Sequence, residues 1–230
     1  MTAPSALLKE VPWSYSKIKN SELCPLKHFE CEIAKNFSDD NEANKWGDQV
    51  HKGLAHACAG RADLPMTMKD YQPWVDRVRA GAGDTLVEQK YALTRDLKPT
   101  EYFGKDVWFR GIADIVKISG VAALALDWKT GKLDNVDSIQ LMLMATCIFA
   151  HHSQLQKIRT KFIWLKEGDG IATTEDYTRE DIRAAWVPLL ERVQRYQHMV
   201  RAEHFPPKPG RLCARWCPVK SCQYNGKRQS

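Results

Sequence analysis

The stretch ALALDWKTGK, residues 123–132, decides the fold. An apolar run ends at Leu126 and is followed at once by Asp127, Trp128 and Lys129. A β-strand points residues i and i+2 to the same face, so Asp127 and Lys129 point one way and Trp128 points the other. The stretch therefore predicts a buried strand that brings an acid and an ammonium group to one face of a sheet at its end.

Other runs along the chain supply the elements around this strand. Branched and aromatic residues between Gly, Pro and Asn turns predict further strands at 84–93, 106–118 and 157–166. Apolar residues at helical spacing predict helices at 13–37, with a break at Cys24–Pro25, and at 41–60, 70–83, 138–152 and 178–205. This order predicts an α/β (α+β) fold in which helices flank a mixed central β-sheet.

The length and composition of the chain bound its class. With 230 residues, 43% of them hydrophobic and 27% charged, the chain can build a globular core. We expect a single domain over residues 1–230, with a helical part (1–82), a core (83–205) and a basic, cysteine-rich tail (206–230). The apolar runs are too short for a membrane span, and the first residues lack a secretory signal pattern, which predicts a cytoplasmic protein without membrane contact.

Positive charge is concentrated in the tail. The formal net charge is +6, and residues 206–230 hold Lys and Arg but no acid, so the tail accounts for the whole excess. Such a field favours a polyanion such as nucleic acid, although solvated lysines at a chain end are common without one. Four aromatic residues near basic ones could stack on single-stranded bases or simply pack: Trp13, Tyr15, Trp216 and Tyr224.

A second acid lies in the strand before the deciding one. Asp114 ends the stretch RGIAD (110–114), and adjacent strands could bring it within a few ångströms of Asp127. Two carboxylates so placed repel each other unless a cation lies between them. Mg²⁺ and Mn²⁺ take such oxygen ligands and keep positions for water and a substrate phosphate. With Lys129 on the same face, the set predicts metal-assisted hydrolysis of a phosphodiester.

Four motifs carry a resemblance to a known family: GDQVHKGL, RGIAD, DWKTGK and QLMLM, in this order. They resemble the successive motifs of the PD-(D/E)XK nucleases, in particular the RecB-like exonuclease branch, over about Trp13 to Cys222. The resemblance implies a restriction-endonuclease-like core. One position departs from the pattern, because Met144 stands where the family often has a tyrosine four residues after its glutamine.

The resemblance implies roles for individual residues. Asp114 and Asp127 would bind the metal, and His51 would be a further ligand or would orient the metal site. Lys129 would be the catalytic lysine. Gln140 matches the glutamine that helps to place the lysine or the DNA.

Glu88, in LVEQKYAL, resembles an acid often found on the first core strand of these nucleases. Taken alone, each residue also has an ordinary interpretation. Asp127 and Lys129 could form the exposed end of a hairpin, and His51 could be a satisfied helix histidine. Their joint order and their placement at strand ends favour the functional interpretation.

The cysteines of a cytosolic chain are expected to be reduced, so their spacing matters. Cys213, Cys217 and Cys222 lie close together in the tail and are one short of a tetrahedral site. In the iron–sulfur subclass of the family one cysteine precedes the nuclease core and three follow it. This resemblance implies Cys24 as the fourth ligand, with Cys31 as its rival.

A four-cysteine site holds either a [4Fe–4S] cluster or Zn²⁺. Ligands drawn from both ends of the chain favour the cluster, because zinc ribbons usually draw theirs as two local pairs. Either metal would join the two ends of the chain and hold the basic tail. Cys58 and Cys147, in apolar helical settings, are predicted to lie in the core.

These features predict an Mg²⁺- or Mn²⁺-dependent deoxyribonuclease, an exonuclease that acts on DNA ends or single strands. The compact chain, without a helicase-like phosphate loop, resembles stand-alone nucleases of bacteriophages or mobile elements. That resemblance implies bacterial or phage-infected host cytosol, a role in recombination, repair or phage DNA processing, and a recombination or replication protein as a candidate partner. Two alternatives stay open: a non-catalytic DNA-binding or assembly module, and hydrolysis of RNA.

Overall fold

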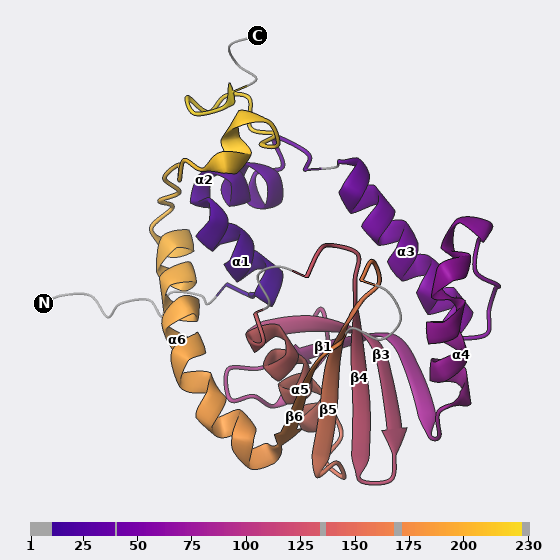
Figure 1. Cartoon of the computed structure of the whole chain (residues 1–230). Coiled ribbons are helices and arrows are strands. Elements are labelled where there is room, and N and C mark those ends of the chain that lie inside the picture. The colour runs from indigo at the N-terminus through magenta and orange to yellow at the C-terminus, as the bar shows by residue number, and fades with distance from the viewer. Residues whose placement is uncertain (1–10, 40, 134–136, 168–171, 227–230) are drawn as a thin grey trace, which may run out of the picture. The chain divides into compact units, whose positions relative to one another are not determined.

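The computed structural model of the chain describes residues 11–39, 41–133, 137–167 and 172–226. The chain forms two compact units, one of Glu42–Trp186 and one that combines Met1–Asn41 with Val187–Ser230. Helix α6 (Arg179–Arg201) begins in the first unit and ends in the second. Figure 1 shows the sheet, which belongs to the first unit.

The sheet has six strands in the order β2-β1-β3-β4-β5-β6. Neighbouring strands are antiparallel except β4 and β5, so the predicted mixed sheet is confirmed. A parallel pair needs a crossover connection, and a helix supplies it here. The strands are β1 (Asp84–Leu93), β2 (Pro99–Thr100), β3 (Phe109–Ser119), β4 (Ala122–Lys129), β5 (Lys157–Trp164) and β6 (Ala172–Thr178).

One face of the sheet is covered by α3 (Glu42–Cys58), the 3₁₀-helix η2 (Met66–Tyr71) and α4 (Gln72–Ala80). The apolar stripe predicted for the helix at 41–60 is confirmed, because it packs into this core. The helix ends at Cys58, and Gly60 follows with φ = 68°. The sheet contributes four buried residues to the same core: Ile115, Leu126, Trp128 and Ile163.

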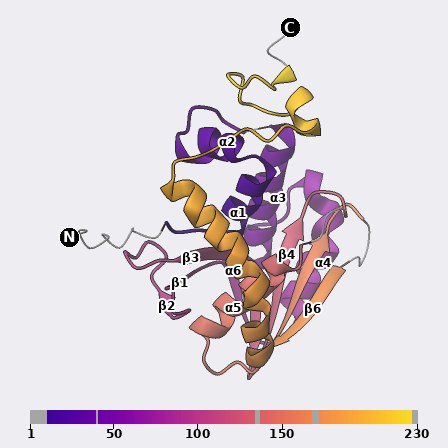
Figure 2. The ribbon, with the colours of Figure 1, turned by 90° about the vertical axis from the view of Figure 1, so that its left-hand side faces the viewer.

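Helix α5 (Ile139–His151) is the crossover between the parallel strands. It contacts β1, β3 and β5, and it lies on the side of the sheet away from α3 and α4 (Figure 2). Nine of its thirteen residues are buried, as its mostly apolar sequence predicts. The observed order of strands and helices confirms the predicted fold class.

The second unit is helical and holds the tail. It contains α1 (Tyr15–Leu23), α2 (Pro25–His28), the π-helix η1 (Phe29–Ile33), the later part of α6 and the 3₁₀-helix η3 (Arg211–Ala214). The predicted break at Cys24–Pro25 is confirmed, because Cys24 has extended backbone and Pro25 opens α2. The rings of Phe29 and Phe205 stack with centroids 4.7 Å apart and join the first helices to the tail.

Two strands were not predicted, β2 and β6. The sequence of β6, ATTEDYT, is polar, and its residues are exposed or half-buried because β6 is an edge strand. It therefore lacks the apolar alternation by which strands are recognised in a sequence. Thr178 ends β6 and caps α6, as predicted: its hydroxyl and backbone N–H both contact the Asp181 carboxylate, at 2.8 and 2.7 Å. No helix in the described part of the chain is long and apolar enough to cross a membrane.

The turn into β1 supplies a first testable prediction. Gly83 has φ = 93°, and a Cβ there would lie 2.1 Å from the carbonyl oxygen of Ile118. Gly83→Ala is expected to lower the free energy of unfolding by more than about 2 kcal/mol, because backbone strain and a clash with main chain add. The matched control is Gly120→Ala, at φ = 57° in open space, with an expected cost of about 1 kcal/mol. Urea unfolding measures both; equal costs would contradict the close approach at Gly83.

Candidate active site

The candidate site lies where β3 and β4 separate. Their pairing ends at Ile115 and Leu126, and beyond it the Asp114 side chain takes the place of the ladder. One Asp114 carboxylate oxygen accepts a hydrogen bond of 2.7 Å from the backbone N–H of Trp128. The other oxygen lies 3.1 Å from Nδ1 of His51, on α3. Asp114 is thus buried and held at both of its oxygens.

We call the point where β3 and β4 separate the fork. Beside it, Asp127, Lys129 and Gln140 contact one another in a closed set of polar interactions. Gln140, in the first turn of α5, donates from Nε2 to Asp127 at 2.7 Å. Lys129 donates from Nζ to the Gln140 amide oxygen at 2.9 Å and forms an ion pair of 2.5 Å with Asp127. Asp127 and Lys129 share a face of β4, as the two-residue period predicts. Gln140 therefore fixes the acid and the ammonium relative to each other.

At Glu88 the side chains of strand β1 change from one face of the sheet to the other. Val87 packs into the core under α3 and α4, whereas Tyr91 contacts the ring of His151 in α5, on the opposite face. A regular strand would point residues four apart to the same face. Glu88 has φ = 50°, and it lies opposite Asp114 in the β1–β3 register. The strand thus turns over at the residue that brings a carboxylate to Asp114.

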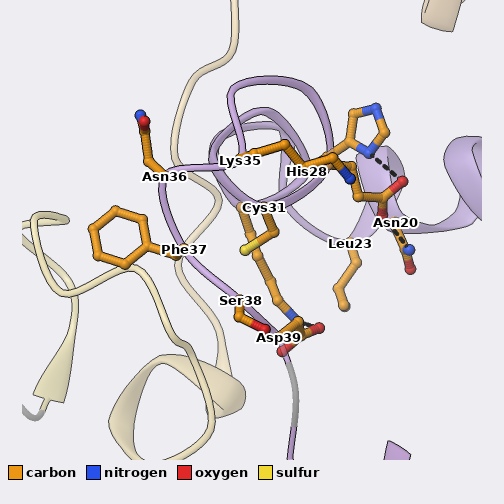
Figure 3. Close-up of a pocket in the computed structure, with 11 residues that line it drawn as sticks. Asn20, Leu23, His28, Cys31, Lys35, Asn36, Phe37, Ser38 and Asp39 are labelled. Atoms are coloured by element: carbon orange, nitrogen blue, oxygen red, sulfur yellow. Dashed lines mark hydrogen bonds and ion pairs between the residues drawn. The ribbon is translucent and has the colours of Figure 1, made fainter.

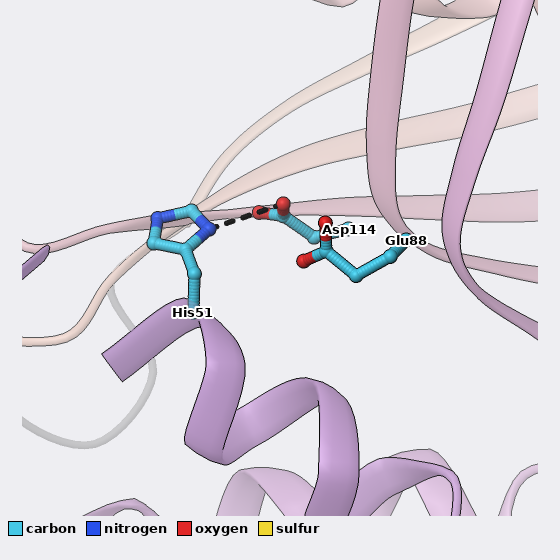
Figure 4. Close-up of side chains that lie close together, drawn as sticks. All are labelled: His51, Glu88 and Asp114. Carbon is cyan, nitrogen blue, oxygen red and sulfur yellow. Dashed lines mark hydrogen bonds and ion pairs between the residues drawn. The ribbon is translucent and has the colours of Figure 1, made fainter. Parts of the chain in front are cut away.

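Three of the predicted residues form a group suited to a divalent cation. One ligand atom each of His51, Glu88 and Asp114 lies within 4.8 Å of the others (Figure 4). Two carboxylates and an imidazole are acceptable ligands for Mn²⁺ and Mg²⁺. Asp127 adds no atom to this group; its oxygens face Lys129 and Gln140 instead.

The titratable groups of the site share an excess of negative charge. Burial raises the pKa of Asp127 to about 6; Lys129 opposes the rise and the charge of Asp114 adds to it. Burial, and then the charge of Asp114, raise the pKa of Glu88 above its ordinary value. Burial alone would lower the pKa of His51, but its hydrogen bond to Asp114 and the surrounding acids raise it. All three shifts favour added positive charge, which a divalent cation would supply.

One contact of the site was not predicted from the sequence. The Phe162 ring, on β5, lies 4.3 Å from Nζ of Lys129 and is itself buried. A cation over an aromatic face is stabilised by the ring, so Phe162 helps to hold the ammonium in place. Nothing in the sequence of β5, KIRTKFIW, marks this residue as a partner of Lys129. Met144, the departure from the family pattern, is buried one turn along α5 from Gln140.

The four predicted cysteine ligands lie in the helical unit, where they line one small cavity: Cys24, Cys213, Cys217 and Cys222. The backbone N–H groups of Lys208 and Gly210 donate to the sulfurs of Cys24 and Cys213, at 3.4 Å each. Hydrogen bonds of this kind tune metal-bound sulfur. The donors present therefore fit a four-cysteine metal site.

Cys31, the rival ligand, lines a different pocket, of about 350 Å³ (Figure 3). Burial, with a contribution from Asp39, raises the pKa of its thiol to about 11, so it stays protonated. Cys58 and Cys147 are buried, which confirms the prediction that they belong to the core.

The four candidate stacking residues differ in exposure. Trp13 is only 1% exposed, so of the two alternatives it is a packing residue. Trp216 and Tyr224 are 67% and 45% exposed. Nearness to basic residues in the sequence did not distinguish a core residue from a surface residue.

Comparisons with known proteins agree with this picture. A solved structure from Eubacterium rectale, described as a candidate exonuclease, shares the fold with a TM-score of 0.56 and 15% identity, covering 94% of this chain and 92% of its own. The structure of SSO0001 covers 96% of this chain and 90% of its own at 12% identity, but its TM-score of 0.42 is too low to add weight. No curated protein matches the chain. The model of the PD-(D/E)XK nuclease superfamily matches residues 12–222, so the chain belongs to that superfamily.

Proposed function

We propose that the protein is a metal-dependent deoxyribonuclease, an exonuclease that acts on DNA ends or in single strands. Membership of the superfamily implies a hydrolase that acts on nucleic acids. The observation that carries the proposal is the placement of the His51, Glu88 and Asp114 group at the fork where Asp127 and Lys129 also lie. A role in recombination, repair or phage DNA processing stays a prediction, as do the single-domain organisation and the cytoplasmic location.

Each residue of the site has a proposed role. His51, Glu88 and Asp114 would hold Mg²⁺ or Mn²⁺, with Asp127 as a further ligand. When bound, the metal supplies a lowered pKa for attacking water and neutralises charge on the phosphate. Lys129 orients the attacking water and stabilises charge that develops at phosphorus.

Gln140 is a positioning residue, since it contacts Lys129 and Asp127 and fixes their geometry. Its role is to keep the ammonium aimed at the scissile phosphate before the substrate arrives. Such pre-organisation lowers the barrier because no side chain must reorient during the reaction.

A non-catalytic DNA-binding or assembly module is the second candidate. The complete set of acids, lysine and glutamine favours the enzyme over this alternative. Incubation with labelled single-stranded DNA, duplex DNA and RNA, in Mg²⁺, Mn²⁺ or EDTA, separates the candidates. Metal-dependent release of nucleotides from DNA supports the proposal, release from RNA alone would replace its substrate, and binding without cleavage in either metal would refute the enzyme.

We also propose a [4Fe–4S] cluster on Cys24, Cys213, Cys217 and Cys222, with Zn²⁺ as the alternative. The four cysteines line one small cavity. One of them comes from the start of the chain and three from its tail, which favours the cluster because zinc ribbons usually draw their ligands as two local pairs.

Exchange of single cysteines tests this site. Cys24→Ser is expected to lose most of the bound iron and to lower the Tm, because a structural metal contributes folding free energy. Cys31→Ser is the matched control, since Cys31 lines the other pocket, and it should keep its iron. Iron and zinc are measured on protein purified without oxygen, together with the visible absorption. Iron retained by Cys24→Ser but lost from Cys31→Ser would reverse the assignment, and stoichiometric zinc would select the alternative.

A further inference from the structure

A cluster of two aromatic and two basic residues lies beside strands β1 and β3, which carry Glu88 and Asp114. Tyr102 and Phe103, in the loop between β2 and β3, meet edge to face with ring centroids 5.0 Å apart. Phe103 is 78% exposed. Lys90 Nζ lies 5.5 and 5.8 Å from the two ring centroids, and the Arg110 guanidinium carbon lies 5.4 and 5.6 Å from them. We call Lys90, Tyr102, Phe103 and Arg110 the aromatic platform.

The platform begins next to the candidate metal group. Lys90 pairs with Ile112 in the β1–β3 register, two residues from Glu88 and Asp114, a separation of about 7 Å along a strand. A ligand on the platform can therefore reach the metal group with little extension.

Folding does not account for the composition of the platform. Phe103 is a large apolar side chain that is exposed to solvent, whereas the exposed positions around it in the loop are polar. Nε of Arg110 is buried and has no hydrogen-bond partner among the described residues. The Arg110 side chain as a whole is only half-buried, and the exposed part of a guanidinium pairs readily with phosphate oxygens.

An exposed phenylalanine and a half-buried tyrosine between two cations fit one class of polyanion. Single-stranded nucleic acid presents unpaired bases, which stack on aromatic rings, and phosphates, which pair with Lys and Arg. The bases inside an intact duplex are stacked on both faces, so only its two terminal base pairs leave a free face for Phe103. The platform therefore favours a single strand over a duplex.

We propose that the aromatic platform binds a single-stranded segment of the substrate beside the metal group, which makes single strands, or duplexes with single-stranded ends, the preferred substrate class. The position of the cut rests on the proposed function, whereas binding to the platform does not. The platform residues come from strands β1 and β3 and the loop before β3. None of them is among the aromatic residues that the sequence indicated, which are Trp13, Tyr15, Trp216 and Tyr224.

Binding without cleavage tests the proposal. In EDTA, Phe103→Ala is expected to weaken binding of a fluorescent oligothymidine by about 5- to 100-fold, the effect of losing one base–aromatic stack. Binding of a blunt duplex of equal length should change less than twofold, roughly the error of the measurement. Phe103→Trp should restore single-strand binding. Met66→Ala is the matched control, because Met66 is another exposed apolar side chain, 74% exposed, in the same unit.

The two cations have a separate readout. Lys90→Gln and Arg110→Gln should each reduce the slope of log affinity against log salt by about 0.7 on a single strand. Phe103→Ala should leave that slope unchanged, since phenylalanine carries no charge. A merely structural cluster would instead show a lower Tm with an unaltered slope.

The outcomes separate this proposal from the proposed function. Wild-type affinity of Phe103→Ala for the oligothymidine, or equal losses on single strand and duplex, would overturn the platform even if the protein cleaves DNA. Failure of the wild-type protein to bind single strands would overturn it too. Selective loss of single-strand binding in a protein that cleaves nothing in Mg²⁺ or Mn²⁺ would keep the platform and refute the nuclease.

Discussion

Asp114→Asn is expected to reduce metal-dependent DNA hydrolysis by at least about 10³-fold, because it removes a charge from the centre of the cation group. The substitution is nearly isosteric. An asparagine oxygen can still accept the hydrogen bond that the Trp128 backbone donates, and the amide can face His51. The fold should therefore survive, and the loss should lie in metal affinity and rate. Initial rates in Mg²⁺ and Mn²⁺, with Mn²⁺ titration calorimetry, measure both.

Asp176→Asn is the matched control for this variant. Asp176 is an exposed acid on β6 that pairs with Arg159 at 2.7 and 2.8 Å, and it has no part in the proposed site. It should leave the rate within about twofold of wild type, since exposed ion pairs contribute little. Activity of Asp114→Asn within tenfold of wild type, with unchanged Mn²⁺ affinity, would remove Asp114 from the metal site.

Lys129→Met is expected to lower kcat by about 10²- to 10³-fold while Mn²⁺ still binds. Methionine keeps the length and the packing on Phe162 but lacks the ammonium that stabilises the transition state. Because the effect arises in the chemical step, KM for DNA should change much less than kcat. Single-turnover rates at saturating protein separate this step from product release.

Gln140→Leu tests whether Gln140 acts through Lys129. Because Gln140 only positions the lysine, this substitution should lower kcat by about 10- to 100-fold, less than the loss of the lysine itself. Lys157→Met, an exposed lysine on β5, is the control for loss of positive charge and should stay close to wild type. If Lys129→Met lowered only the affinity for DNA, the lysine would be a phosphate contact and not a catalytic group.

The acids of the site could be placed from the sequence because strand geometry dictates much of their arrangement. The two-residue period gives Asp127 and Lys129 a common face, and the pairing of Ile115 with Leu126 brings Asp114 next to Asp127. The separation of the strands there could not be predicted. It depends on a side-chain carboxylate that replaces a backbone acceptor, a choice made by tertiary packing.

The choice between Cys24 and Cys31 as the fourth ligand depends on local backbone conformation. Residues seven apart would share a face of a regular α-helix. Here the backbone at Cys24 is extended, and a π-helix begins at Phe29, so the two thiols line separate pockets. Pro25 marks the break at Cys24 in the sequence, but the π-helix has no reliable signature in its residues.

The aromatic platform left no mark in the sequence either. Tyr102 and Phe103 lie in an irregular loop, where periodicity gives no direction to side chains. Lys90 and Arg110 belong to different strands, and only the pairing of β1 with β3 brings them to the same rings. Sequence reasoning could find residues that act along one strand, but not a cluster assembled across three segments.

The left-handed backbone at Glu88 sets the stability of this fold against its proposed catalytic function. A glutamate at φ = 50° is strained, and glycine or asparagine would relieve about 1 kcal/mol there. A related chain that did not need this carboxylate for catalysis would thus gain folding stability from such a substitution. If Glu88 holds the metal as proposed, glycine or asparagine at position 88 of a related chain would mark a more stable protein that has lost the metal site.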